Sequence, residues 1–202
     1  TFDPPHRGHL AAARAVQRRL GLARVIFIPA ARPPHKRASA IAPARDRLRM
    51  VHLAIRGRAW CQASDIELRR RGPSYSLDTI RAMRRRHPGR RIWFIVGSDT
   101  IRTLRTWHRF RDLMKEAHFA AVTRPGVRLA RLPGLAGRLS LVRSRGIRAS
   151  SRTIREAFRG GARRPAHVPT AVAAYIRRHG LYGFRARDEN KAGRHGKAKT
   201  PA

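Results

Sequence analysis

Two histidines near the start of the sequence, His6 and His9, have a spacing that suits polyphosphate binding. They flank Gly8 at the entrance to residues 9–20, whose apolar periodicity predicts a helix. A helix start offers free N–H groups and the positive end of a dipole, and Gly8 lets a ligand approach the backbone closely. Imidazoles at that place can donate hydrogen bonds to phosphate oxygens. The alternatives are two surface histidines beside a helix cap, or a zinc site, for which the sequence lacks further ligands at metal spacing.

A second group of residues suited to anions follows much later in the chain. Ser150 or Ser151 begins a predicted helix that runs to Arg159, and Arg155 lies one turn inside it. Hydroxyls and a guanidinium at a helix N-terminus form a second candidate phosphate site. The alternative is an ordinary capped helix.

Between these groups lie residues suited to a nucleoside or an aromatic ring. Asp99 follows an apolar run in the turn Gly97-Ser98-Asp99, where a carboxylate suits ribose hydroxyls. Trp107 offers a flat surface for stacking, with a core tryptophan as the alternative. Ser76 is predicted to cap a helix start, which is another anion site. The stretch Pro33-Pro34-His35-Lys36 is a proline turn with a cation, or a solvated loop.

The elements that must position these residues alternate between strand and helix. Continuous apolar runs at residues 25–28 and 92–96 are typical of buried parallel strands. Residues 43–56 predict a helix whose inward side chains are Leu48, Val51, His52 and Ile55. The alternation predicts an α/β doubly wound fold with a mostly parallel sheet. Ligands of such sheets bind beyond the carboxyl ends of the strands, and the candidate residues fall after strand ends or at helix starts.

The length and composition suit one soluble domain. The 202 residues can bury a hydrophobic core, and no apolar run is long enough to cross a bilayer or to act as a secretory leader. One cysteine, Cys61, excludes an internal disulfide framework and a multi-cysteine zinc site, so we expect a cytoplasmic protein. We predict a domain over residues 1–183 and a basic, disordered tail over 184–202, which is polar and lacks apolar periodicity.

The net charge of +36 raises the possibility of a nucleic-acid partner. However, 42 of the 47 basic residues are arginine and they are spread along the whole chain, whereas a binding patch is usually more concentrated. A general bias toward arginine explains this distribution. We therefore expect nonspecific attraction of anions, RNA included, and no specific nucleic-acid site.

Taken in order, these motifs resemble those of the bacterial nicotinate-nucleotide adenylyltransferases, members of the HxGH nucleotidyltransferase superfamily. The resemblance runs from Thr1 to about Tyr182 and implies a Rossmann-like nucleotidyltransferase fold. It also implies that His6 and His9 face the phosphates of ATP. The other ATP-binding residues that it implies are Phe2, Asp3, Gly8, Ser150, Ser151 and Arg155. The last group matches the pattern I-S-S-T-x-I-R, except that Ala149 replaces Ile and Arg152 replaces Thr.

The same resemblance implies a mononucleotide site. Trp107 would stack on the nicotinate ring, and the backbone N–H of His108 would bind the ring carboxylate. Ser76 stands where the family commonly has threonine, in a segment that lies at the pyridine ring. The remaining residues implied for this site are Lys36, Ser74, Tyr75, Gly97, Asp99 and Arg124.

The implied reaction moves AMP from ATP to nicotinate mononucleotide, giving deamido-NAD and pyrophosphate. The attacking 5′-phosphate is already anionic, so no protein nucleophile is needed, and catalysis consists of positioning and charge stabilisation. The residues expected to stabilise charge are His6, His9, Lys36 and Arg155. Mg²⁺ would arrive with the ATP phosphates, so we predict no metal site made by the protein.

Three alternatives and one departure accompany this prediction. The alternatives are an adenylyltransferase acting on nicotinamide mononucleotide, one acting on phosphopantetheine, and a catalytically impaired relative that binds anions or RNA. The departure is that the family has an apolar strand and a Gly-Gly pair before its first motif, whereas this sequence begins at Thr1. Such a strand would be central in the sheet and bury much apolar surface, so we expect the natural start to lie upstream. The oligomeric state is left open.

Overall fold

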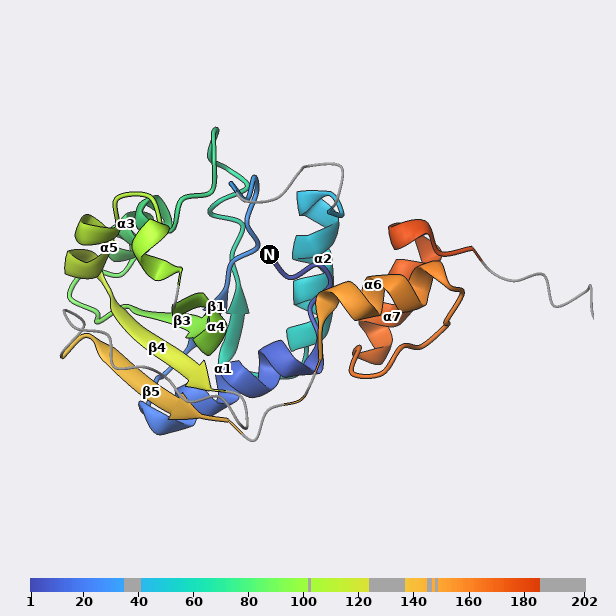
Figure 1. The fold of residues 1–202 in the computed structure, drawn as a ribbon, viewed down its shortest axis with the longest axis horizontal. Coiled ribbons are helices and arrows are strands. Elements are labelled where there is room, and N and C mark those ends of the chain that lie inside the picture. The colour runs from blue at the N-terminus through green and yellow to red at the C-terminus, as the bar shows by residue number, and fades with distance from the viewer. Residues whose placement is uncertain (35–40, 102, 124–136, 145–146, 148, 186–202) are drawn as a thin grey trace, which may run out of the picture.

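The fold is an α/β arrangement in which every paired strand is parallel to its neighbour (Figure 1). The computed structural model describes residues 1–34, 41–101, 103–123, 137–144, 147 and 149–185. Its strands are β1 (Val25–Phe27), β2 (Cys61–Ala63), β3 (Trp93–Gly97), β4 (His118–Thr123) and β5 (Leu139–Arg143). The predicted α/β class with parallel pairing is confirmed.

Helices connect these strands along most of the described chain. They are α1 (Arg7–Arg19), α2 (Ala44–Ile55), α3 (Ser76–Arg86), α4 (Ser98–Ile101), α5 (Phe110–Glu116), α6 (Ser151–Arg159) and α7 (Thr170–Arg178), with short 3-10 turns η2 (Leu104–Thr106) and η3 (Leu181–Gly183). In Figure 1, α6 and α7 lie at the end of the molecule opposite to α3 and α5. The candidate residues at the starts of α3 and α6 therefore lie on helices at opposite ends of the fold.

The strands form two hydrogen-bonded sheets. One contains β1 and β2, and the other contains β3, β4 and β5 in that order. Among the described residues β1 and β3 each have one strand partner, and side chains connect the two sheets: Ile95 of β3 packs both against the cluster around Phe27 and against the cluster around Val122. The expected strand upstream of Thr1 is not tested by these residues and stays a prediction.

Helix α2 corrects one detail of the predicted core. Its buried residues include Arg47, Met50 and Val51, whereas His52 is exposed and Leu48 is only half-buried. Two of the four predicted inward residues, Val51 and Ile55, are buried, and the other two were misplaced because a buried arginine does not count as an inward residue in such a pattern. The side of α2 that faces the core therefore carries a charge.

The C-terminal end of the described chain packs onto α2. Buried side chains of α2, α6 and α7 form one cluster, whose members include Met50, Phe158 and Ile176. Phe184, the first residue assigned to the tail, packs edge-on to Phe158 with ring centroids 6.2 Å apart. Residues 186–202 lie outside the described residues, so the disordered tail stays a prediction.

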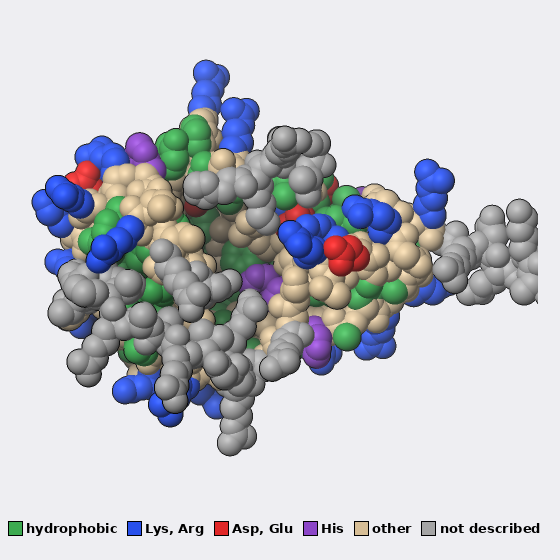
Figure 2. All heavy atoms as spheres, in the orientation of Figure 1, with side chains coloured by type: hydrophobic (Ala, Val, Ile, Leu, Met, Phe, Trp, Pro, Cys, Tyr) green, Lys and Arg blue, Asp and Glu red, His purple; other side chains and the backbone are tan. Residues whose placement is uncertain are grey.

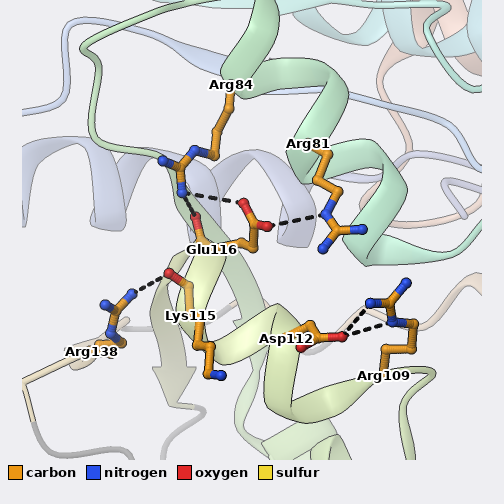
Figure 3. Close-up of polar contacts among 7 residues, drawn as sticks. All are labelled: Arg81, Arg84, Arg109, Asp112, Lys115, Glu116 and Arg138. Atoms are coloured by element: carbon orange, nitrogen blue, oxygen red, sulfur yellow. Dashed lines mark hydrogen bonds and ion pairs between the residues drawn. The ribbon is translucent and has the colours of Figure 1, made fainter.

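Helices α3 and α5 are joined by one carboxylate, that of Glu116 (Figure 3). Arg81 donates to it at 3.1 Å and Arg84 at 3.3 Å. Arg109, which precedes α5 in a left-handed conformation, pairs with Asp112 at 2.7 Å. With 11 acidic residues against 47 basic ones, such carboxylates are shared between arginines.

Candidate active site

The two histidines of the first motif lie directly beside one another. His6 is the extended residue before α1, and its backbone N–H donates to Nδ1 of His9 at 3.2 Å. The two rings stack with their centroids 3.7 Å apart. Because Nδ1 of His9 accepts, a neutral His9 carries its proton on Nε2, which is then a donor directed away from this contact. The helix start therefore presents the paired imidazoles that the sequence predicts.

Gly8 is required by the packing of this turn. A Cβ at Gly8 would lie 2.9 Å from Nδ1 of His6 and 3.3 Å from the carbonyl oxygen of Ile147. Both distances are shorter than ordinary van der Waals contacts. We expected a ligand to approach the backbone at Gly8 closely. In the structure the groups that lie close to Gly8 are protein groups, the His6 ring and the Ile147 carbonyl oxygen.

The start of α6 lies against the loop that precedes α1. Ser151 Oγ donates to the carbonyl oxygen of Pro4 at 3.0 Å, and Arg155 Nη1 donates to that of Asp3 at 2.9 Å. Ser150 is the extended residue before the helix, as predicted, and its side chain makes no capping hydrogen bond. The two candidate phosphate sites, far apart in the sequence, are therefore adjacent in space.

Asp3 anchors the first loop. Its side chain is 1% exposed, and Oδ1 accepts from the backbone N–H of Ala42 at 3.1 Å and from the Tyr182 hydroxyl at 2.9 Å. Oδ2 lies 3.6 Å from Arg155 Nη1 and has no hydrogen-bond partner among the described atoms. Two causes raise the pKa of Tyr182 far above its usual range: burial, which is the larger, and the negative charge of the Asp3 carboxylate. The Tyr182 hydroxyl therefore remains protonated and acts as a donor. The carboxylate therefore faces the protein interior.

Arg47 holds the loops that carry the candidate site, and sequence reasoning missed it. Its guanidinium is buried and donates to the carbonyl oxygens of Ala42 at 2.9 Å, Ala30 at 2.6 Å, Ala31 at 3.4 Å and Thr1 at 3.2 Å. Burial lowers the pKa of Arg47, while the nearby Asp3 carboxylate opposes that shift. Arg47 thereby joins α2, the loop after β1 and the first residue of the chain. Among 42 arginines, nothing in the sequence distinguishes it.

The segment before α3 meets two other loops. Ser74 and Arg32 exchange hydrogen bonds, from Ser74 N to Arg32 O at 2.9 Å and from Arg32 N to Ser74 Oγ at 3.0 Å. Tyr75 stacks on His108 with ring centroids 4.0 Å apart. Ser76 is the first helical residue and Tyr75 precedes it as the extended cap residue, so the predicted capping role of Ser76 is wrong by one position. The helix therefore begins one residue earlier than a cap at Ser76 would place it.

Trp107 lies next to the Tyr75–His108 stack. Its ring is half-buried, edge-on to Phe94 with centroids 5.9 Å apart, and packs against the core cluster that contains Leu113. Trp107 therefore belongs partly to the core, as the alternative expected, and the residue as a whole remains partly exposed.

Of the other residues predicted for the mononucleotide site, the structure describes only Gly97 in full. Gly97 ends β3 and is exposed. The side chain of Asp99 is not described, and Lys36 and Arg124 lie outside the described residues.

One face of the molecule is hollowed near its centre, with histidine side chains at the edge of the hollow (Figure 2). Two other hollows lie along α1, with volumes of about 560 and 530 Å³. Neither is lined by a residue that the sequence predicts for the site, so the site is located by its side chains rather than by these two hollows.

A metal site and a membrane span were both sought within the described part of the chain. No three or more His, Cys, Asp or Glu side chains are grouped there so that they could hold a metal ion. None of the helices described is both long and apolar enough to cross a membrane.

Known proteins resemble this chain over most of its length. A family profile described as cytidylyltransferase-like matches residues 1–157. A relative from Symbiobacterium thermophilum, named probable nicotinate-nucleotide adenylyltransferase, is 44% identical over 190 residues, which is 90% of this chain and 91% of the relative. A relative of the same name from Dehalococcoides mccartyi is 40% identical over 190 residues, covering 90% of this chain and 93% of its own.

Solved structures share the fold. The Plasmodium falciparum nicotinic acid mononucleotide adenylyltransferase complexed with NaAD matches with a TM-score of 0.72 at 16% identity, covering 92% of this chain and 95% of that one. A putative nicotinate-nucleotide adenylyltransferase from Vibrio parahaemolyticus matches with a TM-score of 0.64 at 16% identity, covering 90% of each chain. At these identities the likeness extends to the fold alone.

Proposed function

This chain belongs to the cytidylyltransferase-like family and, within it, to the nicotinate-nucleotide adenylyltransferases, and we propose that it transfers AMP from ATP to nicotinate mononucleotide. The products are deamido-NAD and pyrophosphate. The observation that carries the proposal is the meeting of the His6–His9 pair with the start of α6 on the loop between Thr1 and His6. This arrangement brings imidazoles, helix N–H groups and a guanidinium to one place, which suits a polyphosphate.

On the ATP side, we assign phosphate binding to His6, His9, the start of α6 at Ser150 and Ser151, and Arg155. The attacking oxygen of the mononucleotide 5′-phosphate forms a bond to the α-phosphorus of ATP, and the bond to pyrophosphate breaks. Negative charge builds up on the phosphate oxygens during this step. Fixed donors beside those oxygens stabilise that charge without reorganising, which is how such a site accelerates the reaction.

On the mononucleotide side, we assign the ring to Tyr75, His108 and Trp107. The Tyr75–His108 stack supports this assignment because it joins two segments that the family resemblance places at the pyridine ring. The exposed part of Trp107 is available to stack, and the backbone N–H of His108 would bind the ring carboxylate. Ser74, Ser76, Gly97, Asp99, Lys36 and Arg124 complete the proposed set.

Mg²⁺ enters this proposal as part of the substrate. It binds phosphate oxygens and retains several waters, so it does not need a cage of protein ligands. Residues 1–183 form the proposed catalytic domain. The cytoplasm is the proposed location, a compartment that suits a chain whose only cysteine, Cys61, is unpaired.

The proposal is tested by measuring pyrophosphate release with ATP and one of three acceptors. We expect release with nicotinate mononucleotide at a kcat/KM at least tenfold above that with nicotinamide mononucleotide or phosphopantetheine. A preference for either of the other acceptors would overturn the substrate assignment. Absence of release with all three, from a chain that is folded by circular dichroism, would overturn the assignment as an enzyme.

A further inference from the structure

Tyr182, near the end of the described chain, contacts the loop at its beginning. Its backbone adopts φ 63° and ψ 21°, the left-handed region that is unfavourable for a non-glycine residue. In this conformation its hydroxyl donates to Oδ1 of Asp3 at 2.9 Å, across 179 positions of sequence. A strained residue whose side chain ends on a candidate active-site loop is a reason to look for a functional role.

The Asp3–Arg155 pair at this place is longer than a charge-assisted hydrogen bond. Nη1 of Arg155 lies 3.6 Å from Oδ2 of Asp3, whereas such bonds usually measure about 2.7–2.9 Å. Nη1 instead donates to the backbone carbonyl oxygen of Asp3 at 2.9 Å. The carboxylate is 1% exposed and Oδ2 has no hydrogen-bond partner among the described atoms, so it has capacity for a closer partner.

Other groups near the carboxylate are already fixed. The backbone N–H of Ala42 donates to the same Oδ1 as Tyr182 does. Arg47, the second cation that acts on Asp3, donates to backbone carbonyl oxygens of Thr1, Ala30, Ala31 and Ala42. Arg155 is therefore the cation best placed to close on Asp3 if the carboxylate loses a donor.

We propose that Tyr182 is a positioning residue: its hydroxyl donates to Oδ1 of Asp3 and so weakens the attraction of that carboxylate for Arg155, which would otherwise close from 3.6 Å into a short ion pair. This inference rests on the proposed function, in which the Arg155 guanidinium binds a phosphate of ATP. Without the hydroxyl, a buried carboxylate with one remaining hydrogen bond gains most by pairing with the nearest guanidinium. That pairing would neutralise the charge that the phosphate site offers.

The first experiment is Tyr182→Phe, with isothermal calorimetry of inorganic triphosphate as the direct probe. We expect triphosphate to bind about tenfold more weakly and the KM for ATP to rise by a similar factor. The kcat should fall as well, because the proposed function gives Arg155 a share in stabilising the charge that builds up on the phosphates during the reaction. Unchanged triphosphate affinity and KM in a folded variant would overturn the proposal.

The second experiment removes the competing charge. In Asp3→Asn the side chain no longer attracts Arg155, so triphosphate should bind more tightly than in the wild type. Adding Tyr182→Phe to Asp3→Asn should then cost nothing further in triphosphate affinity, which a double-mutant cycle measures. Weaker binding by Asp3→Asn, or equal losses from Tyr182→Phe in both backgrounds, would show a merely structural role. The Asp3→Asn arm also keeps the proposal testable if Tyr182→Phe does not fold.

Tyr175→Phe is the matched control. Tyr175 donates to a carboxylate as well, Oδ1 of Asp46 at 2.7 Å, and packs against the same core cluster as Tyr182. We expect a lower melting temperature in both variants and weaker triphosphate binding only in Tyr182→Phe. If the wild type binds triphosphate but releases no pyrophosphate with any acceptor, the proposed function fails, and the calorimetric comparison still decides the role of Tyr182.

Discussion

At the scale of single residues, the proposed chemistry depends on a few side chains that are held by their neighbours. His9 shows this most clearly, because its Nδ1 accepts from the His6 backbone and its ring is stacked on the His6 ring. Its tautomer and its direction are therefore set before any ligand binds. Such preorganised donors are the groups whose loss costs an enzyme most.

The first prediction concerns His9→Ala. Removing one fixed donor to the developing phosphate charge should lower kcat about 10²–10³-fold, with KM for ATP changed much less. The variant should keep its circular dichroism spectrum. His87→Ala is the control, since His87 is the residue after α3 and lies outside the proposed site. Turnover within threefold of the wild type in His9→Ala would contradict the assignment.

A second prediction tests the fit of Gly8. The Cβ of Gly8→Ala would meet the His6 ring at 2.9 Å, so that ring must shift, with a stability loss of about 1–3 kcal/mol and a fall in kcat. Gly160→Ala is the matched control, because its Cβ would meet only ordinary contacts at 3.5 and 3.6 Å. Urea unfolding and pyrophosphate release measure both quantities. Equal effects from the two substitutions would contradict the role given to Gly8.

The sequence allowed us to predict the candidate residues that belong to a local pattern. It did not allow us to predict residues whose importance comes from contacts with distant parts of the chain. His6, Gly8, His9 and the start of α6 are recognisable because their chemistry depends on a helix start, which the local sequence encodes. Arg47 and Tyr182 act through contacts with Thr1 and Asp3, far away along the chain. Their residue types carry no such signal: one is an arginine in an arginine-rich chain, and the other follows a glycine turn.

At the scale of elements, α2 connects the parts of the site through one charged side chain. Arg47 donates to carbonyl oxygens on three different segments, which places four backbone acceptors around a buried guanidinium. Buried acceptors that lose their donor carry the full cost of desolvation. The loop before α1 therefore depends on α2 for its position.

The third prediction follows from that dependence. Arg47→Met removes the donors while keeping much of the volume, and it should lower the free energy of unfolding by about 3–5 kcal/mol because it leaves backbone carbonyl oxygens on three segments without their donor. Arg49→Met on the exposed side of the same helix is the control and should change stability by less than about 0.5 kcal/mol. Urea unfolding followed by circular dichroism distinguishes the two. A small effect at Arg47 would mean that the loop is held by other contacts.

The fourth prediction concerns the junction of α2 and α7 at high pH. Burial, and to a smaller extent the hydrogen bond to Asp46, raise the pKa of Tyr175 to about 12. A folded-state pKa above the unfolded value of about 10 contributes stability that is complete below pH 10 and is lost as the pH rises toward 12. Tyr175→Phe should reduce the decline in melting temperature between pH 9 and pH 11, the window in which the unfolded tyrosine ionises. An identical decline in the wild type and the variant would count against this coupling.

The elements themselves were predictable wherever the apolar pattern is strong. β1 and β3 come from continuous apolar runs, and α1 comes from clear helical periodicity. The division of the strands into two sheets was not predictable, because hydrogen bonding between strands depends on which edges meet in space. The inward side of α2 was partly misplaced for the related reason that burial of Arg47 is decided by distant carbonyl groups.

At the scale of the whole molecule, the dominant property is the excess of positive charge. The 47 basic residues face 11 acidic ones, and Figure 2 shows Lys and Arg side chains on widely separated parts of the visible surface. One of the few carboxylates, that of Glu116, pairs with two arginines, Arg81 and Arg84. A surface of this kind attracts polyanions over a long range and without regard to their sequence.

The fifth prediction separates this general attraction from binding at the site. At low salt, a mixed-sequence RNA should bind and inhibit pyrophosphate release, and its affinity should fall by about 10³-fold or more between 50 and 200 mM salt, since counterion release drives the interaction. The KM for ATP should change far less over the same range, because a site assembled from fixed donors contributes hydrogen bonds as well as charge. Heparin should act like RNA. Inhibition that discriminated between RNA sequences and persisted at high salt would require a dedicated nucleic-acid site, which evenly spread arginines do not provide.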